Sequence, residues 1–121
     1  MIYDNLLSSF FSQVPECLEY FYKRKAENLI DENSGAHIIF GLILVPFILE
    51  QHYNGHVRLL KQIFRFLEKM AVSDDPKVVE VLDFTVLEQL ADEENVVLSD
   101  LKKYMGPATL QHLASIMQYF M

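Results

Sequence analysis

Residues 36–53 are apolar on almost every side of a helical projection, and this segment limits the possible folds more than any other part of the chain. Its longest apolar run, residues 38–49, has twelve residues. As a helix this run spans about 18 Å, against about 30 Å for a bilayer core, so we do not expect it to cross a membrane. We predict a central helix buried by neighbours on several sides, with a kink or a break at Pro46, which lacks an N–H.

Apolar residues recur with helical spacing along the rest of the chain, and no alternating strand pattern competes with them. Asp4 and Ser34 are candidate caps of the first and third helices, and Gly106-Pro107 precedes the last. The predicted stretches are residues 4–13, 15–30, 36–53, 56–71, 75–91, 97–104 and 107–120. Because about 100 to 150 residues commonly share one core, we predict an all-α fold, a compact bundle of about six helices forming one domain over residues 1–121.

The sequence offers no set of residues for catalysis or for a cofactor. No serine, threonine or cysteine lies in a recognisable nucleophile motif, and the four glycines are isolated rather than grouped in a phosphate-binding loop. His52 and His56 are four residues apart, but Asn54-Gly55 interrupts the helix between them, so we expect no metal site. With a single cysteine, Cys17, and no signal peptide, we expect a cytoplasmic protein that binds rather than catalyses.

Charge is concentrated in residues 74–100, where nine acids accompany one base and give a local charge of −8, against −7 for the whole chain. The acids are Asp74, Asp75, Glu80, Asp83, Glu88, Asp92, Glu93, Glu94 and Asp100. A solvated face usually mixes both signs, so this imbalance favours a docking surface for a basic partner over mere solubility. The same charge repels nucleic acid and anionic membranes, and we expect neither as a partner.

Phe84 occupies an unusual position on the predicted helix 75–91. At 100° per residue, Val79, Leu82, Val86 and Leu90 share one face, whereas Phe84 falls among charged residues on the opposite face. Two interpretations remain open. In the one we favour, the C-terminal helices cover Phe84, and in the other it is an exposed aromatic anchor within an acidic rim, as in many binding hot spots. The apolar end, residues 116–121, packs either on the core, which we favour, or on a second copy of the chain.

Two stretches, IFRFLEKMAVSDDPKVVEVLDFTVLEQLADEE followed by LKKYMGPATLQHL, resemble a family of small helical bacterial proteins associated with polymorphic-toxin loci. The resemblance covers roughly residues 38–116 and includes FGLILVPFILEQ, and the helices around SDDP are also similar to a HEAT-type hairpin. It implies an immunity protein of the contact-dependent growth inhibition type. Such a protein binds and blocks a cognate toxin, in many cases a nuclease and most simply an RNase, whose active site is basic because it holds phosphates.

We therefore predict a non-catalytic immunity protein that covers the active site of a basic nuclease toxin. The alternative is a helical protein-interaction adaptor with a regulatory or structural role, and a small enzyme is a third hypothesis. The predicted partner-binding residues are Asp74, Asp75, Glu80, Phe84, Glu88, Asp92, Glu93 and Glu94.

Overall fold

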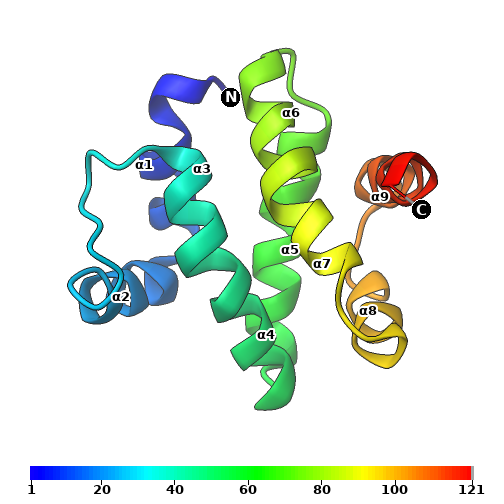
Figure 1. Ribbon diagram of the computed structural model, residues 1–121, viewed down its shortest axis with the longest axis horizontal. Coiled ribbons are helices and arrows are strands. Elements are labelled where there is room, and N and C mark those ends of the chain that lie inside the picture. The colour runs from blue at the N-terminus through cyan, green and yellow to red at the C-terminus, as the bar shows by residue number, and fades with distance from the viewer. Residues whose placement is uncertain (121) are drawn as a thin grey trace.

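The computed structural model describes residues 1–120 and is all-α, with no strand among these residues (Figure 1). The helices are α1 (Leu6–Gln13), α2 (Pro15–Arg24), α3 (Ala36–Ile39), α4 (Val45–Tyr53), α5 (Val57–Ala71), α6 (Pro76–Val81), α7 (Glu88–Ala91), α8 (Asn95–Lys102) and α9 (Pro107–Phe120). A π-helical turn, Phe40–Leu44, joins α3 to α4, and a second, Leu82–Leu87, joins α6 to α7. The two long helices that result, 36–53 and 76–91, lie side by side (Figure 1).

Helix 36–53 continues through Pro46, so of the two predicted alternatives the break is wrong and the kink stays a prediction. The π turn ends at Leu44, two residues before the proline, and the Val45 N–H donates to the Phe40 carbonyl five residues back. A π turn widens the helix locally and changes which carbonyls need a donor, so it accommodates a residue that lacks an N–H. Asn54 and Gly55, with φ +69° at the glycine, end the helix as predicted.

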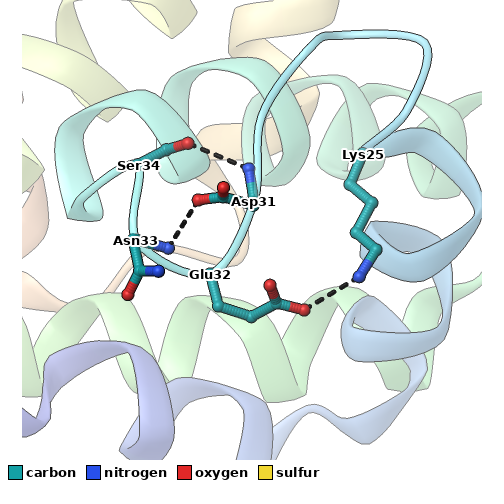
Figure 2. A network of polar contacts seen from close by, with 5 residues as sticks. All are labelled: Lys25, Asp31, Glu32, Asn33 and Ser34. Atoms are coloured by element: carbon teal, nitrogen blue, oxygen red, sulfur yellow. Dashed lines mark hydrogen bonds and ion pairs between the residues drawn. The ribbon is translucent and has the colours of Figure 1, made fainter.

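The second helix ends at Arg24 and not at Ile30, because the Asn28 side-chain amide donates to the Arg24 carbonyl at 2.9 Å and Leu29 has φ +55°. A loop with its own hydrogen bonds follows (Figure 2). The Asp31 carboxylate accepts from the Asn33 N–H at 2.8 Å, and the Ser34 hydroxyl accepts from the Asp31 N–H at 2.9 Å. Such local side-chain bonds compete with helical ones.

Neither predicted cap in this half of the chain forms. Ser34 is engaged in the loop, and Gly35, with φ +93°, is the residue that precedes α3. Asp4 lies inside a 3₁₀ turn, Tyr3–Asn5, that leads into α1, and its side chain caps no helix. Both predictions were wrong because a capping residue type does not determine where the helix starts.

α5 carries the most continuous buried face and packs against α1, α4, α6 and α9. It forms an antiparallel hairpin with helix 76–91 (Figure 1). Helix 36–53 packs against α2, α5 and the second π turn, but Ile38 and Leu42 on its remaining side are exposed. The helix is therefore buried by neighbours on several sides, as predicted, while one side stays exposed. By length and composition this helix is long and apolar enough to cross a membrane, and half of it is buried within the fold.

α9 is held in place by a side chain from α5. The Glu68 carboxylate accepts from the Thr109 N–H at 2.8 Å, the Thr109 hydroxyl at 2.7 Å and the Ala108 N–H at 3.0 Å. It thus caps the helix start from 41 residues away in sequence. Of the apolar C-terminal residues, Ile116 is buried and Met117 packs against the core, whereas Met121 lies outside the described residues.

Candidate functional site

A hollow of about 650 Å³ opens between helix 76–91 and α9. It is lined by Phe84, Glu88, Gln89, Ala91, Asp92, Glu93, Asn95, Ile116 and Met117. Four of these, Phe84, Glu88, Asp92 and Glu93, are predicted partner-binding residues. The fold thus places the aromatic residue and three of the carboxylates around one concave surface.

Phe84 is 55% exposed, so the interpretation that the C-terminal helices cover it is wrong. α9 packs beside helix 76–91, and Ile116 and Met117 form the far wall of the hollow without closing over the ring. The π turn contributes to this exposure, because it directs Leu82, Thr85, Val86 and Leu87 inward and leaves Phe84 outside. An exposed phenylalanine beside buried apolar side chains and carboxylates has the make-up of a protein-binding hot spot.

The carboxylates around the hollow are free. Within residues 1–120, the side chains of Glu88, Asp92 and Glu93 form no hydrogen bond or ion pair. Other acids of the same segment are engaged, since Asp83 contacts His112 Nδ1 at 2.9 Å and Asp100 contacts Lys103 Nζ at 3.3 Å. The negative charge at the hollow is therefore available to an external cation.

Asp74 and Asp75 lie at the opposite end of helix 76–91 from Asp92, about 24 Å away along sixteen helical residues. Asp75 has a structural role, because its side chain accepts from the Tyr3 N–H at 2.7 Å and the Lys77 N–H at 3.0 Å. These two hydrogen bonds lower the pKa of the Asp75 carboxyl. The predicted helix start at Asp75-Pro76 is confirmed. The structure does not bring these two acids to the hollow.

Glu80 and Glu94 are exposed near the hollow but do not line it. Glu80 lies one turn before Phe84 on the same helix, and Glu94 directly precedes α8. The fold also brings four residues to the site that the sequence analysis missed: Gln89, Asn95, Ile116 and Met117. The apolar pattern of α9 is visible in the sequence. The sequence does not show which edge of helix 76–91 α9 packs against.

Basic residues gather elsewhere. A second hollow, of about 490 Å³, lies between α5 and the end of α8 and is lined by Lys61, Arg65 and Lys103. Its one acid, Glu68, is engaged in capping α9. Positive and negative side chains thus gather at different hollows. None of the basic residues that line the second hollow lines the acidic one.

The described residues contain no group of three His, Cys, Asp or Glu side chains that could hold a metal ion. His52 Nε2 lies 3.9 Å from Asp100 Oδ2, whereas His56 Nδ1 contacts Gln51 Oε1 at 2.5 Å, so the two histidines have separate partners. The thiol of Cys17 is fully buried, and burial raises its pKa. What the acidic hollow offers chemically is binding of a cationic, partly apolar surface.

A family model described as a domain of unknown function (DUF7674) matches residues 7–120. No curated protein and no solved structure matches the chain significantly.

Proposed function

The chain belongs to the DUF7674 family of domains of unknown function, and we propose that it is an immunity protein whose acidic hollow covers the active site of a cognate basic nuclease toxin. One observation carries the proposal: the hollow combines exposed Phe84 with the unpaired carboxylates of Glu88, Asp92 and Glu93. The mechanism is binding alone, and the chain needs no catalytic residue or cofactor for it.

A nuclease must hold the phosphates of its substrate, so lysine and arginine side chains line its cleft. Carboxylates that are not neutralised within the inhibitor pair with those side chains and imitate the charge of the substrate. A field of one sign also speeds association, by about 10-fold to 1,000-fold at low salt. Rapid capture suits an inhibitor that must reach a toxin before the toxin cuts nucleic acid.

Phe84 supplies the apolar part of the contact. Charge pairs at the rim of an interface contribute mainly to the rate of association, whereas a buried aromatic ring contributes to the lifetime of the complex. A partner that covers the half-exposed ring and the neighbouring Met117 removes apolar surface from water at the centre of the acidic rim.

The alternative is a helical adaptor that binds another basic protein through the same surface. It is favoured by the same hollow, which would suit a basic protein of any activity. The genetic neighbourhood separates the two hypotheses: a gene for a toxin-delivery protein or a small basic nuclease domain beside this one supports immunity. A consistent association with other kinds of gene supports the adaptor.

The direct test is co-expression with the basic nuclease domain encoded beside this gene. We expect Glu88→Lys with Glu93→Lys to abolish protection and to lower the association rate by about tenfold or more. The matched control is Glu19→Lys with Glu27→Lys, which makes the same charge change on the side of α2, across the molecule from α9 (Figure 1). If the hollow variant still protects at physiological salt, blockade by charge is wrong.

A further inference from the structure

Helix 36–53 leaves a row of apolar residues in solvent. Ile38 and Leu42 are 47% and 45% exposed, and Pro46, on the next turn, is also exposed. The four-residue spacing puts all three on one side of the helix, and Glu50 continues the row after them. Single exposed apolar residues are ordinary, but a contiguous row in the middle of a long helix is typical of a protein-binding surface.

This row is next to Phe84. His37 Nδ1 and Thr85 Oγ1 are 2.6 Å apart and join the two long helices, and the chain neighbours of this pair are Ile38 and Phe84. At Gly41 the helices come so close that an added Cβ would lie 3.0 Å from Gln89 Nε2. Both helices run in the same direction in front of α5 (Figure 1). Two parallel exposed stripes therefore form one face of the molecule.

On helix 76–91 the exposed stripe reads Glu80, Phe84 and Glu88, with one helical turn between successive residues. The face thus has an apolar centre, made by Ile38, Leu42 and Phe84, and carboxylates at its edges. The side chains of Glu80 and Glu88 have no hydrogen-bond or ion-pair partner among the described residues. The acidic hollow continues this face along Glu88.

We infer that the parallel pair of helices 36–53 and 76–91 binds one amphipathic helix of the basic partner. The apolar stripe of that helix lies over Ile38, Leu42 and Phe84, and lysines or arginines along its flanks meet Glu80 and Glu88. Recognition of a helix in a groove uses apolar anchors at this spacing. The inference rests on the proposed function and adds the element that the partner presents: a basic, apolar helix beside its active-site cleft.

Charge selects this occupant over the others. A second copy of the chain, docked face to face, would bring its own Glu80 and Glu88 near the same carboxylates, and like charges at close range oppose the contact. An anionic membrane surface is repelled in the same way. A helix with a basic flank satisfies both the apolar centre and the acidic edges.

The test uses a defined probe with the intact chain. The probe is a synthetic 18-residue helical peptide with leucines along one face and lysines on both flanks, titrated into the ¹⁵N-labelled protein and followed by NMR. One control peptide has the same composition with the leucines spread around the helix, and another has glutamate in place of lysine. We expect shift changes at Ile38, Leu42 and Phe84 with the first peptide only.

Two protein variants test the same surface. Ile38→Ser with Leu42→Ser should weaken peptide binding by about tenfold or more, as loss of hot-spot contacts does. The matched control, Val72→Ser with Val96→Ser, removes side chains that are 65% and 72% exposed elsewhere and should leave binding unchanged. Any of three results would overturn the inference. These are shift changes confined to residues 92–94, equal binding of the scrambled peptide, and no binding at millimolar peptide.

Other occupants give different outcomes. Sedimentation velocity that detects a dimer, abolished by the Ile38→Ser/Leu42→Ser variant, would identify a second copy and refute the inference. If the protein binds anionic vesicles and the same variant abolishes that binding, the occupant is a membrane and the inference is refuted. In the co-expression assay, loss of protection by Glu88→Lys/Glu93→Lys but not by Ile38→Ser/Leu42→Ser would refute the docked helix and leave the immunity proposal standing.

Discussion

Replacing Glu68 tests how the fold positions the far wall of the acidic hollow. Its carboxylate receives three hydrogen bonds, two from Thr109 and one from Ala108, all between 2.7 and 3.0 Å. Loss of an N-terminal cap costs about 0.5–2 kcal/mol, and a hydrogen bond to a charged group contributes about 1.5–3 kcal/mol. Because the site is only partly buried, water replaces some of the lost hydrogen bonds. We therefore expect Glu68→Ala to lower the free energy of unfolding by about 2–3 kcal/mol.

Chemical and thermal unfolding measure this effect. At roughly 4 °C per kcal/mol for a chain of this size, the midpoint should fall by about 8–12 °C. Glu19→Ala, which removes an exposed glutamate of α2, is the control and should change stability by less than about 0.5 kcal/mol. A loss as small as the control's would refute the capping role.

Gly106 gives a sharper version of the same test. A Cβ at this position would overlap the Glu68 carboxyl group, so Gly106→Ala should push the carboxylate away from the start of α9. Gly106→Ala should therefore cost much less in a Glu68→Ala background than in the native protein. If the two substitutions are additive, Gly106 does not act through Glu68.

The pH dependence of stability follows from the same contacts. Desolvation raises the pKa of Glu68, but the hydrogen bonds from Thr109 and Ala108 outweigh it, so the pKa lies below its ordinary value. A lowered folded-state pKa means that the contribution is complete above the unfolded-state pKa of about 4.5 and is lost as pH falls through the folded-state value. The difference between native protein and Glu68→Gln should therefore shrink in acid.

Three further outcomes are expected. Asp75→Ala should lower the midpoint of urea unfolding, because it removes a helix cap that also holds the N-terminal turn; an unchanged midpoint would contradict this. Phe84→Ser should leave the unfolding midpoint nearly unchanged and weaken partner binding, whereas Phe64→Ala, at a fully buried ring, should cost about 3–5 kcal/mol; comparable losses would mean that Phe84 is covered in solution. Cys17 should react with a thiol reagent only as fast as the protein opens, and rapid labelling of the native state would show that the core around it is accessible.

Local patterns determined most of the helices. Asp75-Pro76 starts helix 76–91, Asn54-Gly55 ends helix 36–53, and Gly106-Pro107 precedes α9, each as predicted, because caps and backbone restrictions act over a few residues. The all-α class follows from the same spacing. The two π turns were not predictable, since the identity of neighbouring residues does not show how one long helix adjusts to another.

The sequence determined by itself that negative charge collects within residues 74–100, and that Phe84 lies opposite the apolar face of its helix. Only the tertiary structure decided which of these acids are free and whether Phe84 is exposed. A helical projection gives the angle between side chains but not which neighbour covers them, so the exposure of Phe84 and Ile38 depended on where α9 and α2 pack. It also separated acids bound within the fold, such as Asp75, from those left free at the hollow, because hydrogen-bond partners 41 or 72 residues apart meet only in three dimensions.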